Sequence, residues 1–165
     1  LAGRYPRVLR EAYATLGRSL ASPVPLTSDR DIARILADTR SVAVLGASAD
    51  PARPSYRVAR FLIDEGYEVH LVNPGLAGQQ LHGRAVRAAL AEIPVAVDMV
   101  DVFRQPHFLP EIAQRAVELG IGTLWTQLGV VNHAAVIEAE KDGLEVVMDR
   151  CPAIEVPRLR ATGLI

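Results

Sequence analysis

Five short apolar runs alternate with longer amphipathic stretches between residues 41 and 148, and this alternation constrains the fold more than any other feature of the chain. The runs comprise residues 42–45, 68–72, 97–103, 122–125 and 145–148. Short runs of this kind are typical of strands that are buried on both faces of a parallel sheet. A sixth, weaker strand is expected around residues 83–85.

Three amphipathic stretches between these runs are predicted to be helices. The first contains Val58 and ends at Gly66, and the second begins near Pro110 and ends at Gly120. The third runs from an Asn cap at position 132 to Gly at position 143. Glycine directly after a helix is the usual left-handed C-terminal stop. The chain is therefore predicted to be an α/β protein with a Rossmann-like, doubly wound parallel sheet covered by helices on both faces.

The strand order predicts where a ligand would bind. In the six-stranded form of this fold the spatial order is 3-2-1-4-5-6, and a crevice opens between the C-terminal ends of the first and fourth strands. In this chain the loops after those two strands begin at residues 46–48 and 103–105. We therefore expect these two loops to border the binding site.

Residues 1–38 are predicted to be an N-terminal helical extension of a domain that comprises residues 39–165. Apolar residues recur at helical spacing between positions 5 and 20, and prolines at positions 23 and 25 then interrupt the helix. A second short helix is expected to begin at a Thr27 or Ser28 cap. Its apolar side would carry Ile32, Ile35 and Leu36.

Charge and cysteine content restrict the classes of partner. The chain has 18 Lys and Arg against 19 Asp and Glu, a formal net charge of −1, so nothing attracts it as a whole to nucleic acid or to an anionic membrane surface. A single cysteine cannot form an internal disulfide or a structural thiolate zinc site, and it is typical of a reducing compartment. The four histidines lack metal-ligand spacing, no run is long enough to span a bilayer, and charges interrupt residues 1–20 where a signal peptide would be apolar. These features favour a cytoplasmic protein without a metal.

The loop after the first strand has the residue types of a phosphate-binding loop. Gly46 permits a tight turn and a close approach of a ligand to the backbone, and the N–H groups at the start of the next helix favour an anion. Ser48 and Ser55 can donate hydrogen bonds, and Arg53 and Arg57 can neutralise a diphosphate. The same residues also suit an ordinary connection with surface arginines, and so short a motif does not separate the two interpretations.

This loop departs from the fingerprint of NAD-binding proteins. That fingerprint requires the pattern Gly-x-Gly-x-x-Gly and an acidic residue about 20 residues later that binds the ribose. Here Ser48 replaces the second glycine, no third glycine follows, and Pro51 and Pro54 lengthen the loop. The second strand is followed by Asn73 and not by an acidic residue. The departures disfavour NAD and favour a ligand that carries an additional phosphate.

Seven sequence blocks, taken together, indicate a family. They are VAVLGAS (42–48), PARPSYRVA (51–59), GYEV (66–69), VNP (72–74), VDMVDVFR (97–104), LWTQLG (124–129) and VMDRC (147–151). In this order they resemble the small bacterial and archaeal CoA-binding proteins, whose domain is similar to the CoA-binding N-terminal domain of the succinyl-CoA synthetase α subunit. The second domain of that subunit, which carries its phosphorylated histidine, has no counterpart in 165 residues. This argues against thiokinase activity by this chain alone.

The resemblance implies that the chain binds coenzyme A or an acyl-CoA as its small-molecule ligand. It places Gly46, Ala47, Ser48, Arg53, Ser55, Tyr56 and Arg57 around the phosphates, Val72, Asn73 and Pro74 on the nucleotide side, Val102, Phe103 and Arg104 beside the adenine or pantetheine arm, and Gln127 and Gly129 deeper in the crevice. The residues show no convincing catalytic constellation, so a binding module is favoured over an enzyme. The alternatives are an NAD(P)-binding oxidoreductase, a CoA-ligase subunit that acts with a partner chain, and an interaction protein that responds to CoA. Self-association or a partner protein remains open.

Four further residues have both a functional and a structural interpretation. Cys151 could be a reactive thiolate beside Arg150, but a small buried residue is the commoner role of a free cysteine. Asp98 and Asp101 could act as general bases. We instead expect Asp98 to cap the beginning of its strand and Asp101 to bind backbone amides near the crevice. Trp125 could stack near a ligand, but we expect it in the core.

Overall fold

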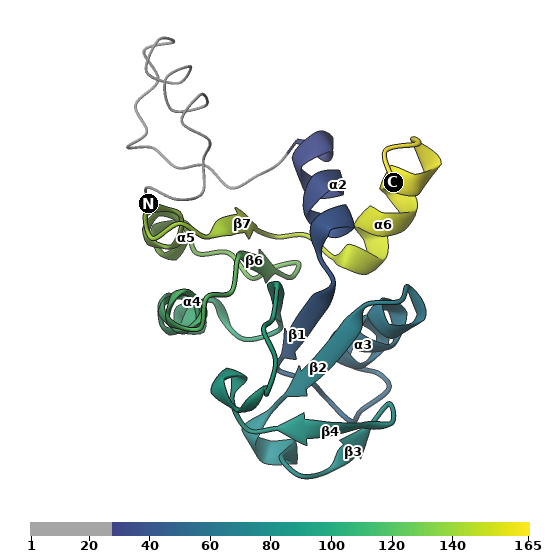
Figure 1. Ribbon diagram of the computed structural model, residues 1–165, viewed down its shortest axis with the longest axis vertical. Coiled ribbons are helices and arrows are strands. Elements are labelled where there is room, and N and C mark those ends of the chain that lie inside the picture. Colours follow the sequence, from purple (N-terminus) through teal and green to yellow (C-terminus); the bar gives the residue numbers. More distant parts are fainter. Residues whose placement is uncertain (1–27) are drawn as a thin grey trace.

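A seven-stranded sheet lies at the centre of the computed structural model, which describes residues 28–165 (Figure 1). The strands are β1 (Ser41–Leu45), β2 (Glu68–Val72), β3 (Gln80–Leu81), β4 (Arg84–Arg87), β5 (Met99–Val102), β6 (Thr123–Thr126) and β7 (Glu145–Val147). Their order across the sheet is β3-β4-β2-β1-β5-β6-β7, and only the β3–β4 pair is antiparallel. The six parallel strands therefore confirm the predicted order 3-2-1-4-5-6, with the weak strand near residue 84 in third place.

Helices cover both faces of the sheet, which confirms the doubly wound α/β fold. The helices are α2 (Asp29–Asp38), α3 (Pro54–Asp64), α4 (Leu109–Glu118), α5 (His133–Lys141) and α6 (Pro152–Ala161), with short 3₁₀ turns at Pro74–Leu76, Leu90–Glu92 and Pro106–Phe108. Buried side chains of α2, α3 and α6 form one core with Val42 and Val44 of β1. Those of α4 and α5 form a second core with Ala43, because successive side chains of a strand point to opposite faces. In Figure 1, α4 and α5 accordingly lie on one side of the sheet and α3 and α6 on the other.

The second of the two predicted N-terminal helices is present as α2. Ser28 is its N-cap, and the Ser28 Oγ accepts a hydrogen bond from the Asp31 N–H at 3.1 Å. Ile32, Ile35 and Leu36 are buried in the core, as their spacing predicted. The predicted helix at residues 5–20 and the proline interruption lie outside the part of the chain that the structure describes. The domain boundary after residue 38 stays a prediction.

Two elements could not be predicted from periodicity. Helix α6 has no clean apolar stripe, because Glu155 is among its buried residues and Pro157 lies inside it. Strand β3 has two residues, too few for an alternating pattern. None of the helices within residues 28–165 is both long enough and apolar enough to cross a membrane.

Candidate functional site

Gly46 lies where the loop after β1 passes the end of β5. Its φ of +94° lies in the left-handed region that favours glycine. A Cβ atom at this position would lie 3.0 Å from the carbonyl oxygen of Phe103 and 3.2 Å from its carbonyl carbon. The backbone at the end of β1 therefore approaches the backbone at the end of β5 as closely as it can, at the point where the strand order predicts the crevice.

Strand β2 anchors the same loop from the other side. The N–H groups of Gly46 and Ala47 both donate to the Val72 carbonyl oxygen, at 2.9 and 3.2 Å. The Asn73 Nδ2 donates to the Ala47 carbonyl oxygen at 2.7 Å, and the Asn73 N–H donates to the Arg87 carbonyl oxygen at 2.9 Å. Asn73 thus joins the ends of three strands at the place where an NAD-binding protein would carry its ribose-binding acid.

The loop continues into the N-terminus of α3. The Ser48 Oγ accepts from the Asp50 N–H, and the Asp50 carboxylate accepts from the Ala52 N–H, so two local turns fix the loop. The helix begins at Pro54, and the side chain of its N-cap residue, Arg53, makes no capping hydrogen bond. The first N–H groups of this helix are therefore not capped by a side chain, which suits an anionic ligand.

Arginines without carboxylate partners surround this edge of the sheet. Arg53 and Arg57 lie at the start of α3, Arg87 ends β4, and Arg104 follows β5. Within residues 28–165 none of the four forms an ion pair, whereas Arg34 of α2 and Arg158 and Arg160 of α6 do. The guanidinium carbon of Arg104 lies 4.3 Å from the centre of the Phe108 ring. Arg87 is not among the site residues expected from the sequence, although its place at the end of the weak third strand could have indicated it.

Tyr56 is supported by a residue that sequence reasoning also missed. The rings of Tyr56 and His82 are 4.3 Å apart, so the turn between β3 and β4 packs against the first turn of α3. His82 has a φ of +51°, and its Nε2 is buried without a hydrogen-bond partner. Burial lowers the pKa of His82, which favours the neutral ring in this contact.

The structure brings the expected site residues to one edge of the sheet, but their side chains differ in solvent exposure. All fifteen follow or end β1, β2, β5 or β6, or begin α3. The side chains of Ala47, Val72 and Val102 are buried in the core, so only their backbone can face a ligand. Arg53, Arg57, Pro74 and Gly129 are exposed. Which ligand atoms each residue contacts stays a prediction.

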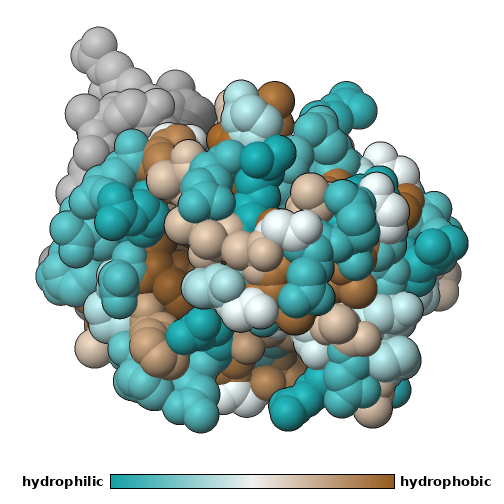
Figure 2. Space-filling model, turned by 90° about the horizontal axis from the view of Figure 1, so that it is seen from below, coloured by the Kyte–Doolittle hydropathy of each residue, from teal (hydrophilic) through white to brown (hydrophobic). Residues whose placement is uncertain are grey.

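This edge of the sheet is visible in two figures. The arrowheads of β1 and β2 point to the lower side of Figure 1, and Figure 2 views the molecule from that side. Hydrophobic groups (brown) are recessed there between hydrophilic groups (teal). A surface of this kind suits a ligand with a charged part and an apolar part.

The two aspartates of the fourth predicted strand have different roles. Asp98 accepts hydrogen bonds from the N–H groups of Arg40 and Ser41 at 2.8 and 3.0 Å, which confirms that it caps the beginning of its strand. These N–H groups and the Ser41 hydroxyl hold the pKa of Asp98 below its ordinary value, against the effect of burial. The expectation that Asp101 binds backbone amides is wrong. Its partner is the Gln127 side-chain amide, and burial raises the pKa of Asp101 to about 7.

Cys151 is buried at the N-cap of α6, and burial raises the pKa of its thiol. Both observations support the structural interpretation over a reactive thiolate. Trp125 is fully buried, as expected, and its Nε1 donates to the Arg150 carbonyl oxygen at 2.8 Å. No group of three or more His, Cys, Asp or Glu residues that could hold a metal occurs from residue 28 onward.

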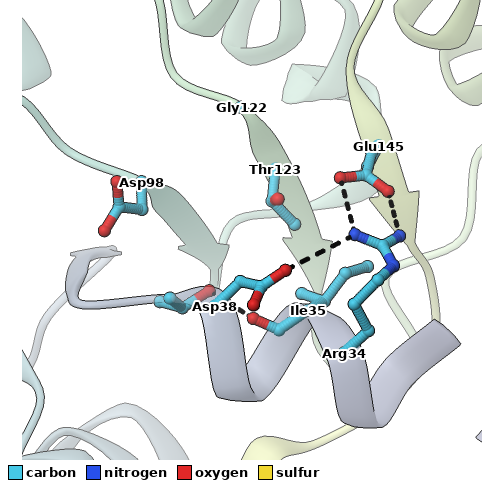
Figure 3. Close-up of a pocket in the computed structure, with 8 residues that line it drawn as sticks. Arg34, Ile35, Asp38, Asp98, Gly122, Thr123 and Glu145 are labelled. Atoms are coloured by element: carbon cyan, nitrogen blue, oxygen red, sulfur yellow. Dashed lines mark hydrogen bonds and ion pairs between the residues drawn. The ribbon is translucent and has the colours of Figure 1, made fainter. Parts of the chain in front are cut away.

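A hollow of about 200 Å³ lies at the opposite edge of the sheet (Figure 3). It lies beside α2 and the amino ends of the strands, and Arg34, Asp38, Asp98 and Glu145 are among its lining residues. Arg34 forms ion pairs with Glu145 and Asp38, so the charges within it are already partnered. This hollow is therefore separate from the predicted crevice.

Comparison with known proteins identifies the family. The family model described as "CoA binding domain" matches residues 40–157. The chain belongs to this CoA-binding domain family. It is 36% identical over 124 residues to the uncharacterized protein YneT of Bacillus subtilis. The aligned region covers 75% of this chain and 90% of YneT.

Two further relatives connect the family to a ligase and to a solved structure. The chain is 31% identical over 126 residues to the α subunit of the ADP-forming acetate–CoA ligase I of Pyrococcus furiosus. The aligned region covers 68% of this chain but only 27% of that subunit. A hypothetical protein from Pyrococcus horikoshii OT3 has the same fold, with a TM-score of 0.77 and 31% identity over 84% of this chain and 97% of that one. The chain is thus a CoA-binding domain related to a ligase α subunit, as the resemblance implied.

Proposed function

We propose that this protein binds coenzyme A or an acyl-CoA in the crevice at the carboxyl ends of β1 and β5, and that it does so without catalysing a reaction by itself. One observation carries the proposal. The Gly46 loop leads into a helix N-terminus without a side-chain cap, and Arg53 and Arg57 beside it have no carboxylate partner within residues 28–165. Uncompensated guanidinium groups next to a helix N-terminus without a side-chain cap favour a ligand with several phosphates.

The end of β2 favours a ligand with a phosphate on its ribose, such as CoA, over NAD. Asn73 occupies the place of the ribose-binding acid, and its amide is engaged with the loop carbonyl at Ala47. CoA carries a phosphate on its ribose, which an acid at this place would repel and nearby arginines would attract. NAD is therefore the weaker candidate.

The decisive experiment is calorimetric titration of the ligand-free protein with CoA, NAD and NADP at one moderate salt concentration. We expect one CoA site per chain and no binding of either dinucleotide. Binding of a dinucleotide without CoA would contradict the proposal and favour an oxidoreductase.

A pair of substitutions on α3 localises the site. Arg57→Ala removes an unpaired guanidinium at the start of the helix, and we expect roughly a tenfold loss of CoA affinity, the size of one charge-assisted hydrogen bond. Arg60→Ala is the matched control, because Arg60 lies one turn later and is paired with Asp64 at 3.2 Å. Equal affinities of the two variants would reject this position for the phosphates.

The ligase relationship supports a second candidate function, a subunit that binds CoA for a partner chain. The chain spans 27% of the length of the acetate–CoA ligase α subunit, so the remaining parts of such an enzyme would have to come from elsewhere. This candidate predicts that CoA binding persists in the isolated chain while acyl-CoA synthesis requires an added protein. A cytoplasmic location stays part of the proposal, and the choice between self-association and a partner protein stays open.

A further inference from the structure

Asp101 and Gln127 form a buried polar pair at the carboxyl ends of β5 and β6. Asp101 is fully buried, and Gln127 is 6% exposed. The Gln127 Nε2 donates to both oxygens of the Asp101 carboxyl group, at 2.8 and 3.0 Å. No other side chain in the described part of the protein donates to this carboxyl group. The pair therefore depends on a single amide group for its hydrogen bonds.

This contact fixes the orientation of the Gln127 amide. An ionised carboxylate can only accept hydrogen bonds, so the NH₂ group must face Asp101 and the carbonyl oxygen Oε1 must point away. Oε1 has no hydrogen-bond partner among residues 28–165. If this atom were fully buried, it would be a buried polar atom without a partner, but the only side-chain atom of that kind in this range is the His82 Nε2. Oε1 is therefore not fully buried, and a nearly buried side chain keeps an unpaired acceptor at the protein surface.

The strand order places this acceptor on one side of the proposed crevice. Gln127 directly follows β6, and its N–H donates to the Val102 carbonyl oxygen at the end of β5. Asn73, on the expected nucleotide side, lies at the end of β2, across β1 from β5. A CoA molecule with its phosphates at the Gly46 loop and its nucleotide toward β2 would extend its pantetheine arm toward β5 and β6.

We propose that the Gln127 Oε1 accepts a hydrogen bond from a donor of the pantetheine arm, and that Asp101 is the positioning residue that keeps this oxygen turned outward. The inference rests on the proposed function. The pantetheine arm offers two kinds of donor, amide N–H groups and the terminal thiol. A free acceptor with a fixed direction favours a ligand that carries a hydrogen-bond donor at this place. A purely apolar chain would leave the acceptor without a partner.

Protonation of Asp101 would release this orientation. A protonated carboxyl group can donate to Oε1 and draw it inward, so the acceptor would be lost as the pH falls. Burial raises the pKa of Asp101 to about 7, which brings the change into the neutral range. The titratable group that interacts electrostatically with Asp101 is Cys151 at the start of α6, and Glu155 interacts in turn with Cys151. Burial raises the pKa of the Cys151 thiol from 9.0, so this thiol does not titrate near neutrality.

The test compares CoA affinities of the wild type and Asp101→Asn between pH 6 and pH 8. Asparagine does not titrate, and the ligand's own titration cancels in the ratio of the two dissociation constants. We expect Asp101→Asn to bind CoA roughly fivefold more weakly at pH 8, the size of one neutral hydrogen bond, and about as well as the wild type at pH 6. Asp98→Asn is the matched control at the other end of the same strand, and its ratio to the wild type should stay near one at both pH values.

A second variant keeps the inference testable if Asp101→Asn does not fold. Gln127→Met removes the acceptor and should lose roughly the same fivefold in affinity at pH 8. In the Gln127→Met background, Asp101→Asn should cause no further loss, because the two residues act through one oxygen. Repeating the titrations with acetyl-CoA identifies the donor: a loss shared by both ligands indicates an amide N–H, and a loss confined to CoA indicates the thiol.

The outcomes separate the two proposals. No CoA binding by the wild type would overturn the proposed function and this inference together. CoA binding with a ratio that does not change with pH, or full affinity of Gln127→Met for both ligands, would overturn this inference and leave the proposed function standing.

Discussion

The Asn73 side chain holds the loop after β1, because its Nδ2 donates to the Ala47 carbonyl oxygen at 2.7 Å. Asn73→Asp would supply the acid that a dinucleotide site requires, but a carboxylate cannot donate to Ala47. We expect the variant to lose roughly tenfold in CoA affinity without gaining NAD binding, since two acceptors would face each other at the loop. Calorimetry with both ligands measures this directly. A variant that gains NAD affinity would show that the loop tolerates a dinucleotide.

Substitutions at Gly46 and Gly66 allow two contributions to the free energy of unfolding, backbone strain and steric contact, to be measured separately. Their φ angles are +94° and +93°, but a Cβ at Gly46 would meet Phe103 whereas a Cβ at Gly66 would meet nothing within 4 Å. Gly66→Ala should lower the free energy of unfolding by about 1 kcal/mol through backbone strain alone. Gly46→Ala should cost roughly 2 kcal/mol more, because the end of β5 must move. Urea unfolding of both variants checks this, and equal losses would mean that the Phe103 contact relaxes freely.

The close approach of Gly46 to Phe103 also affects which substitution suits a binding experiment. Gly46→Val would place a branched side chain where the diphosphate is expected to approach. The contact with Phe103 shows that it would also strain the fold, so the exposed Arg57 is the better position for a test.

Most of the sheet could be predicted from the sequence because buried parallel strands are nearly continuous apolar runs. The bounds of β2 agree with the predicted run, and Asn132 caps α5 as expected, its Oδ1 accepting from the Ala135 N–H at 3.1 Å. The crevice follows from the strand order alone. Contacts between side chains distant in the sequence could not be predicted. The Asp101–Gln127 pair joins residues 26 positions apart, and neither local pattern indicates the other.

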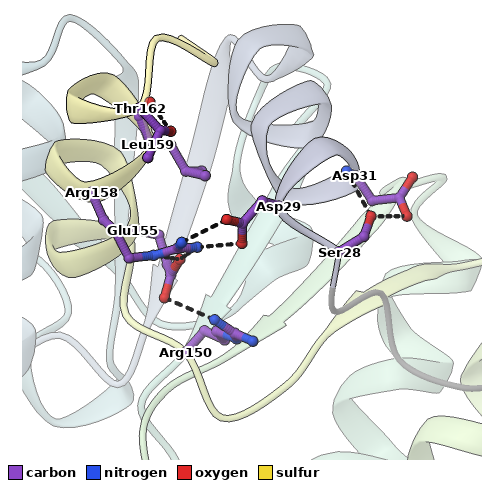
Figure 4. A network of polar contacts seen from close by, with 8 residues as sticks. All are labelled: Ser28, Asp29, Asp31, Arg150, Glu155, Arg158, Leu159 and Thr162. Atoms are coloured by element: carbon purple, nitrogen blue, oxygen red, sulfur yellow. Dashed lines mark hydrogen bonds and ion pairs between the residues drawn. The ribbon is translucent and has the colours of Figure 1, made fainter.

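Helix α6 is held by charges that the sequence pattern does not reveal (Figure 4). Glu155 is 5% exposed and lies between Arg150, at 3.2 Å, and Arg158, at 2.5 Å. Arg158 also pairs with Asp29 of α2 at 2.7 Å. Glu155→Gln should lower the free energy of unfolding by roughly 3 kcal/mol, because it leaves guanidinium groups without their shared buried partner. Asp29→Asn, at the exposed end of the network, should cost much less, because an exposed ion pair contributes little to stability. Similar losses for the two variants would show that burial of Glu155 is not what makes the network important.

The stability of the protein should depend on pH through Asp101. Burial raises the pKa of this carboxyl group from 3.8 to about 7, so the folded state binds its proton more tightly than the unfolded state does. The stability that the protonated group contributes is complete below about pH 4 and is lost as the pH rises to about 7.

Asp101→Asn removes this dependence. The free energy of unfolding of the wild type should fall relative to that of the variant by up to about 1.4 kcal/mol per pH unit in this range. Above pH 7 the difference should become constant. Urea unfolding of both proteins at pH 5, 6, 7 and 8 measures the difference, with Asp98→Asn as the control, because its lowered pKa places its effect at acidic pH. A difference that does not change between pH 5 and pH 7 would show that Asp101 titrates in the folded protein as it does in water.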